Sequence, residues 1–132
     1  MLSLEKLSSI SKKILYIQNM RALLRKEVMF SDGTDRYVVP NEPQPGEEVK
    51  IRFRTAKTNA DSVFLVIDGK HIEMKVAKST ENFEYFEATY TVGKEKVNYY
   101  FEIVNRFEHC FYDKAGCCNE PRQEYFFSIV PG

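Results

Sequence analysis

The residues best able to do chemistry are two histidines and three cysteines, and four of these five lie near the C-terminus. His109 and Cys110 are adjacent, and so are Cys117 and Cys118. A zinc site favours spaced ligands, such as paired Cys-x-x-Cys elements. Adjacent residues on a strand point to opposite faces, so neither pair readily aims both side chains at one ion. We therefore expect buried or loop thiols and no metal site.

No arrangement of carboxylates, nucleophiles or glycines in the sequence indicates an active site. Glycoside hydrolysis needs two carboxylates across a cleft, but residues such as Glu47, Glu48 and Asp68 lie outward on predicted strands or in turns. Acyl transfer needs a base beside its nucleophile, and His71 follows a predicted hairpin turn on the polar face. No glycine-rich phosphate loop follows a predicted strand. We expect no catalytic residue and no cofactor.

Aromatic rings are the remaining candidates for binding. Aromatic residues make up 14% of the chain, and all of them are Phe or Tyr. On the predicted strands, Tyr85 and Tyr100 lie on the faces opposite the apolar ones. Exposed rings on a sheet can stack on flat apolar partners, including the faces of sugars. The alternative is that both rings cover the second face of the sheet or lie under an N-terminal helix.

The periodicity of the chain predicts one helix followed by a β-rich region. Residues 1–25 contain no Gly or Pro and carry apolar residues at helical spacing, so we expect a helical extension that docks on a partner or on its own domain. Residues 26–132 form the second predicted unit. Residues 36–40 are expected to be extended. Short strands are expected over residues 26–32, 48–55, 61–67, 70–76, 83–92, 96–104, 109–113 and 124–130.

The connections between these strands indicate an antiparallel fold. Asp68-Gly69 is a strong hairpin turn, and Ile72, Met74 and Val76 are expected to point inward after it. A second hairpin is expected around Gly93, and a loop over residues 114–121. Eight short strands without a second helical stretch predict a mainly β protein, an immunoglobulin-like antiparallel β-sandwich with an N-terminal helix.

The bulk composition excludes several classes of partner. The 19 basic and 19 acidic residues give no net charge, whereas nucleic-acid and membrane-surface proteins need a positive field. The odd cysteine count does not fit a secreted disulfide framework, and no signal peptide or membrane-spanning apolar run is present. We expect a cytoplasmic protein without nucleic-acid or membrane partners.

From Phe30 onward the sequence resembles one enzyme family's N-terminal domain. The ordered stretches are YVVPNEPQPGEEVKIRFRTAK, VFLVIDGK, FEYFEATYTV, VNYYFEIVN, FYDKAGCCNEP and YFFSIVPG. They are similar to the N-terminal domain of the neopullulanase, cyclomaltodextrinase and maltogenic-amylase group of glycoside hydrolase family 13. That domain is classed as a family 34 carbohydrate-binding module.

The resemblance implies a place for this chain within a larger enzyme. In the family, the closing strand and a Pro-containing linker lead into a (β/α)8 catalytic barrel, so the SIVPG end is expected at that junction. The catalytic carboxylates would lie in the barrel, and this chain would hydrolyse nothing. The parent enzyme would be a glycoside hydrolase acting on α-1,4 and α-1,6 glucans.

The resemblance also implies two roles and a set of contact residues. The domain would bind α-glucan oligosaccharides or cyclodextrins, and it would support a homodimer in which it walls the partner's active-site cleft. Tyr85 and Phe86 stand where the family often has Tyr-Trp. Tyr112 and Asp113 match the loop that faces the active site in dimeric members, and Tyr100 lies in the Tyr-Tyr-Phe strand. The alternative is a stand-alone immunoglobulin-like interaction scaffold without a sugar ligand.

Overall fold

The computed structural model describes residues 25–106 and 108–132. Except for Arg25, the expected helical extension over residues 1–25 lies outside the described residues. The first element is a 3-10 helix, η1 (Lys26–Val28), where a strand was predicted over residues 26–32. Phe30 makes an isolated bridge with Arg54, which places the neighbouring Met29 in the core without extending a strand. Across the described ranges, the structure contains no helix with the length and apolar character that crossing a membrane requires.

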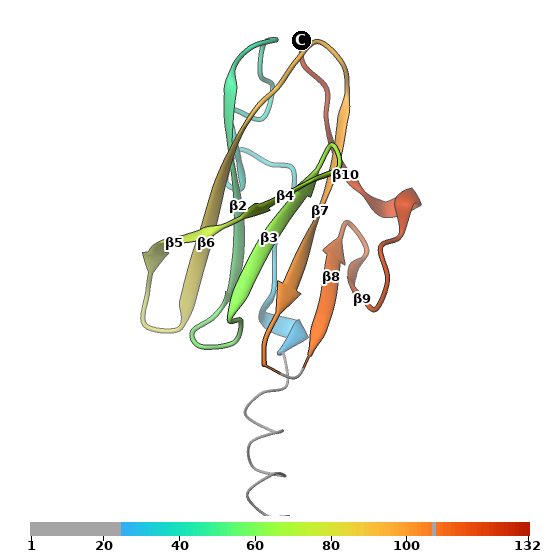
Figure 1. Ribbon diagram of the computed structural model, residues 1–132. Helices are drawn as coiled ribbons and strands as arrows, with labels where there is room; N and C mark the ends of the chain where they lie inside the picture. The colour runs from blue at the N-terminus through green and yellow to red at the C-terminus, as the bar shows by residue number, and fades with distance from the viewer. Residues whose placement is uncertain (1–24, 107) are drawn as a thin grey trace, which may run out of the picture.

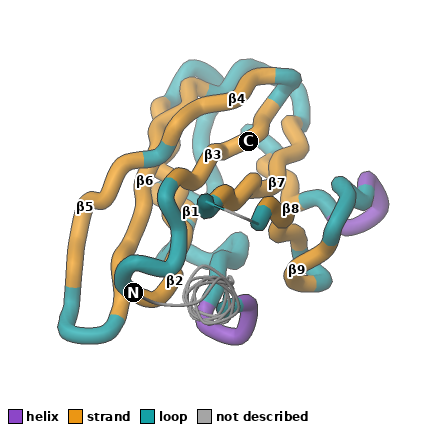
Figure 2. The backbone as a smooth tube through the Cα atoms, turned by 60° about the horizontal axis from the view of Figure 1, so that its bottom comes forward, coloured by secondary structure: helices purple, strands orange, loops and turns teal. Residues whose placement is uncertain are grey.

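The described strands form two antiparallel sheets, which confirms the predicted β-sandwich (Figures 1 and 2). The first sheet has the order β1 (Val38–Val39), β2 (Glu48–Ala56), β6 (Phe83–Thr91) and β5 (Lys75–Ser79). The second has the order β4 (Lys70–Glu73), β3 (Ser62–Ile67), β7 (Val97–Val104), β8 (His109–Asp113) and β9 (Gly116–Cys118), and β10 (Phe127–Ile129) also pairs with β7. A second 3-10 helix, η2 (Gln123–Tyr125), precedes β10.

Alternating apolar positions of the two sheets build the core, as the sequence predicts. Val49, Ile51 and Phe53 on β2 are completely buried, and the ring of Phe53 packs on that of Phe101 with centroids 4.9 Å apart. Burying a side chain of this size stabilises a fold by about 1.5–3 kcal/mol. The completely buried residues of the facing sheet are Val63, Leu65, Ile67, Tyr99, Phe101 and Ile103.

The strand predicted over residues 70–76 is divided between the two sheets. β4 pairs with β3, whereas β5 pairs with β6 on the other sheet. The chain changes sheet at Met74, which is buried and whose N–H donates to the carbonyl of Val63 at 2.8 Å. Because the alternation does not continue through this change, Val76 is 46% exposed. The prediction that Val76 points inward was therefore wrong.

β6 and β7 do not form the predicted hairpin, because they belong to different sheets. β6 pairs with β2 and β5, and β7 pairs with β3, β8 and β10. Residues 92–96 cross between the sheets at the upper end of Figure 1. Each strand still turns its apolar side inward as predicted, because the two strands face one core from opposite layers.

The loop predicted over residues 114–121 contains a strand, and the last predicted strand is shorter than expected. β9 pairs with β8 through a tight turn in which Gly116 has a φ of +105°. A left-handed conformation of this kind is accessible to glycine at little cost. Residues 124 and 125 belong to η2 rather than to a strand, and Phe127 and Ile129 of β10 are buried in the core.

Candidate functional site

β7 presents Tyr100 on the outer face of the second sheet. The ring stacks on Phe126 with centroids 4.6 Å apart and an interplanar angle of 23°. It meets the ring of Phe111, on the neighbouring strand β8, edge-on at 6.0 Å. All three side chains are half-buried. Phe111, Tyr100 and Phe126 thus form an aromatic row across β8, β7 and the segment before β10.

A groove with a volume of about 340 Å³ adjoins one end of the aromatic row. Tyr100 and Phe126 form part of its wall, and the hairpin turn at Asp68-Gly69 forms another part. A groove of this size lies at the lower end of the range for small-molecule sites. The lining residues are Val66, Asp68, Gly69, Lys96, Val97, Asn98, Tyr100, Gln123 and Phe126.

The groove combines ring faces with groups that bind hydroxyls. The carboxylate of Asp68 accepts hydrogen bonds, the amides of Asn98 and Gln123 both donate and accept, and the ammonium of Lys96 donates. Asp68 already accepts a hydrogen bond from the hydroxyl of Tyr90 at 3.3 Å, which orients its carboxylate. A pyranose ring needs this combination, because it has apolar C–H faces and a rim of hydroxyl groups.

The hydroxyl of Tyr100 stays protonated at the edge of this groove. Burial raises the pKa of Tyr100 from its ordinary value, and the negative charge of Glu102 raises it further. The phenol is therefore available as a hydrogen-bond donor over the whole neutral pH range.

Two histidines hold Glu102 beside the aromatic row. The Nε2 atoms of His71 and His109 lie 3.1 Å and 2.7 Å from the two carboxylate oxygens of Glu102. Three strands meet here, because His71 is on β4, Glu102 on β7 and His109 on β8. Within the described part of the chain, no group of three or more His, Cys, Asp and Glu side chains is arranged to hold a metal ion. The two contacts join β4, β7 and β8 on the outer face of the sheet.

The structure does not bring Tyr85 and Tyr100 together. Tyr85 lies on β6 in the other sheet, where it is half-buried and its ring is 5.9 Å from the ammonium of Lys78. The guanidinium of Arg54, opposite Tyr85 in the β2–β6 ladder, lies over the rings of Phe30 and Phe83. Tyr85 thus belongs to a second outer face that is already packed with cationic side chains.

Phe86 and Tyr112, which were expected to face a ligand, lie in the core of this structure. Phe86 is 6% exposed and Tyr112 is 9% exposed. The ring of Tyr112 packs edge-on against Phe53, with centroids 5.5 Å apart, and stacks on Phe127. In this structure neither side chain offers a ring face to a sugar.

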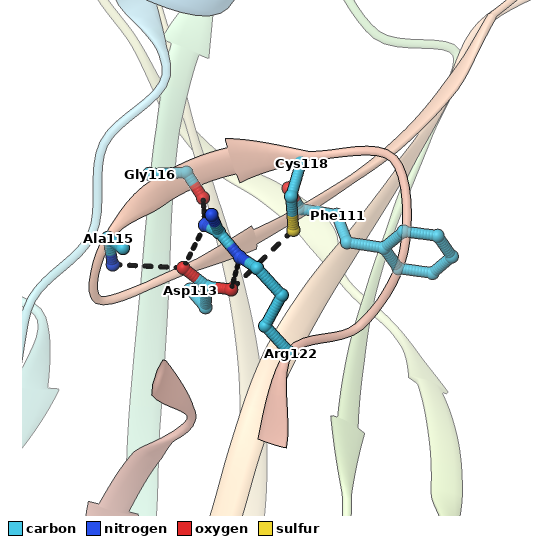
Figure 3. Close-up of polar contacts among 6 residues, drawn as sticks. All are labelled: Phe111, Asp113, Ala115, Gly116, Cys118 and Arg122. Atoms are coloured by element: carbon cyan, nitrogen blue, oxygen red, sulfur yellow. Dashed lines mark hydrogen bonds and ion pairs between the residues drawn. The ribbon is translucent and has the colours of Figure 1, made fainter. Parts of the chain in front are cut away.

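Asp113 is 1% exposed and serves as the centre of a polar cluster (Figure 3). Its two carboxylate oxygens accept hydrogen bonds from Nη2 and Nε of Arg122 at 2.7 Å and 2.9 Å. The N–H of Ala115 and the thiol of Cys118 donate to the same carboxylate. Asp113 therefore ties the β8–β9 turn to the segment that carries Phe126.

Sequence reasoning singled out Tyr100 as a candidate but did not name the other residues of the groove. Strand alternation separates Phe126 from the face of Phe127, but nothing in its local pattern shows that it reaches Tyr100. Asn98 is detectable by strand alternation, because it lies two residues before Tyr100 on the same face. Gln123 reaches the wall of the groove from η2, a 3-10 helix that strand alternation did not predict.

A family model describes most of this fold. The chain matches the model of the alpha amylase, N-terminal ig-like domain over residues 34–130, which include the groove and all five predicted site residues. A search among curated protein sequences gave no match.

Several solved structures share the fold at low sequence identity. A cyclomaltodextrinase matches with a TM-score of 0.68 and 18% identity over 79% of this chain and 19% of that one. A maltogenic amylase from S. marinus matches with a TM-score of 0.62 and 11% identity over 79% and 14%. The type III pullulan hydrolase from Thermococcus kodakarensis matches with a TM-score of 0.53 and 18% identity over 78% and 16%. The chain thus spans less than a fifth of the length of these proteins.

Proposed function

This chain belongs to the family of α-amylase N-terminal immunoglobulin-like domains, and on that premise we propose that it is a non-catalytic domain that binds α-glucan chains. The binding site is the groove beside Tyr100 and Phe126. The parent enzyme degrades α-1,4 and α-1,6 glucans, and its catalytic residues lie in a barrel outside this chain.

One observation carries the proposal: a stacked pair of aromatic rings lies beside a groove lined with amides and a carboxylate. The rings can cover the C–H faces of glucose units, and the polar groups can bind their hydroxyls. The names of the structurally similar proteins support an α-glucan as the ligand, because they include a cyclomaltodextrinase and a pullulan hydrolase.

The same premise extends to assembly and location. Through the family resemblance, the domain contributes to a homodimer in which it narrows the active-site cleft of the partner toward small oligosaccharides and cyclodextrins. We also place the protein in the cytoplasm, because an odd number of cysteines with Cys117 and Cys118 adjacent does not fit a secreted disulfide framework.

Tyr100→Ala is expected to weaken maltoheptaose binding about tenfold, which corresponds to about 1.4 kcal/mol. The loss follows because the substitution removes both the stacking ring and the hydroxyl donor at the edge of the groove. The measurement is an NMR titration of the chain with maltoheptaose, read from amide shifts on β7 and η2.

Tyr85→Ala is the matched control, because it removes a half-buried tyrosine from the other sheet. It should leave the affinity within about twofold, a difference of about 0.4 kcal/mol. If Tyr85→Ala weakens binding and Tyr100→Ala does not, the site lies on the first sheet instead. If the unmodified chain does not respond to maltoheptaose, the protein is an interaction scaffold without a sugar ligand.

A further inference from the structure

Three sulfur-bearing residues lie near the place where Cys117 of the β8–β9 hairpin contacts η1, through the carbonyl of Lys26. The register pairs Tyr112 with Cys117, so Cys110, two residues from Tyr112 on the same strand, shares a face with Cys117. The strand register therefore makes Cys110 and Cys117 diagonal neighbours on one face of the β8–β9 hairpin. The Sγ of Cys117 lies 3.7 Å from the Sδ of Met29. Met29 and Cys110 belong to the hydrophobic core and Cys117 packs against it, so the three residues form one sulfur cluster.

The sulfur cluster is protected on one side and accessible on the other. Cys110 is 2% exposed and Met29 is 4% exposed, whereas Cys117 is half-buried. Both thiols are free. An ion could therefore enter at Cys117 and bind there to Cys110 and Met29, which are shielded from water.

The spacing of the sulfurs suits a shared ion. Two metal–sulfur bonds of about 2.3 Å that meet at 110–120° place the sulfurs about 3.8–4.0 Å apart. The 3.7 Å between Cys117 and Met29 is close to this separation, so a small adjustment admits an ion between them. Thiolate and thioether ligands together are soft donors, and they select Cu(I) over harder divalent ions.

We propose that Met29, Cys110 and Cys117 form a three-sulfur site for a soft monovalent cation of the Cu(I) type. Binding forms bonds from the ion to the thioether and to the two cysteine sulfurs, and it releases the thiol protons without any change of oxidation state. The spacing of the cysteines alone does not reveal this site, because its third ligand, Met29, lies 88 residues before Cys117.

The test is an anaerobic titration of the full chain with Cu(I) against a chromophoric bicinchoninate competitor. The unmodified chain should take one equivalent of Cu(I). Cys117→Ser should abolish competition for the ion. Met29→Leu, which conserves the volume of the buried side chain, should keep the fold and weaken Cu(I) binding at least tenfold.

Cys118→Ser is the control, because its thiol points away from the cluster and donates to the carbonyl of Phe111 and to Asp113. This variant should bind Cu(I) as the unmodified chain does. Circular dichroism of each variant separates lost binding from lost folding. The proposal is overturned if folded Met29→Leu binds Cu(I) with unchanged affinity, or if Cys118→Ser loses the ion as Cys117→Ser does.

Discussion

Arg122→Ala should lower the free energy of unfolding by more than an ordinary surface substitution does, because it leaves the buried carboxylate of Asp113 without its cation. Asp113 is 1% exposed, so water cannot replace the two hydrogen bonds from the guanidinium. The measurement is urea-induced unfolding at neutral pH, followed by far-UV circular dichroism.

Removing the other partner of the pair, by Asp113→Ala, should lower the free energy of unfolding less than Arg122→Ala does. The side chain of Arg122 is 32% exposed and can turn to water, whereas the carboxylate of Asp113 cannot. The double variant should therefore be about as stable as Asp113→Ala alone. Equal costs for the two single variants, or a double variant whose cost is their sum, would show that the pair is not coupled as described.

The Asp113–Arg122 pair also has a consequence for the groove. Arg122 lies on the ring of Tyr125 at 5.0 Å, and the carbonyl of Tyr125 accepts a hydrogen bond from the N–H of Lys114. These contacts hold the segment that places Phe126 on Tyr100. Folded Arg122→Ala should therefore also bind maltoheptaose more weakly than the unmodified chain.

The stability of the protein should fall steeply above about pH 10, with Tyr99 as a main cause. Tyr99 is completely buried, and burial raises its pKa well above the ordinary value of 10.0. Above pH 10 the unfolded chain gives up the phenolic proton while the folded chain keeps it. The free energy of unfolding then falls with pH by about 1.4 kcal/mol per pH unit for each such group. The pKa is also raised for Tyr37, Tyr90, Tyr100 and Tyr112.

Tyr99→Phe isolates the contribution of this one residue. Among the residues that the structure describes, the hydroxyl of Tyr99 has no hydrogen-bond partner. Its removal should leave stability at pH 7 unchanged or slightly increased. The difference in the free energy of unfolding between the variant and the unmodified chain should grow in favour of the variant by about 1.4 kcal/mol from pH 7 to pH 11. Parallel stability curves from pH 8 to 11 would contradict the assignment to Tyr99.

Strand alternation predicted which side chains share a face but not which sheet each strand joins. It placed the inward residues of β2, β6 and β7 correctly, because burial on one side of a strand produces a period of two. It wrongly joined β6 to β7, since two strands that face one core from opposite layers show the same pattern as a hairpin. It also missed the change of sheet at Met74, where a buried apolar residue fits either arrangement.

The candidate site was predictable only in part, for a related reason. The outward direction of Tyr100 follows from its place between Tyr99 and Phe101. Its contact with Phe126 depends on the β8–β9 hairpin and on the Asp113–Arg122 pair, which fold the intervening chain back over β7. Residues 114–121 were predicted as a loop, so the path by which the chain brings Phe126 back to Tyr100 could not be predicted from the sequence.

Calorimetric titration of the unmodified chain with maltoheptaose, beside cellohexaose as a β-linked glucan, tests the account most directly. The groove beside Tyr100 predicts saturable maltoheptaose binding with a Kd below about 1 mM, a free energy of about −4 kcal/mol. Binding of cellohexaose should be at least tenfold weaker. Absence of heat with maltoheptaose up to many millimolar, or equal affinity for the two glucans, would contradict an α-glucan site on this domain.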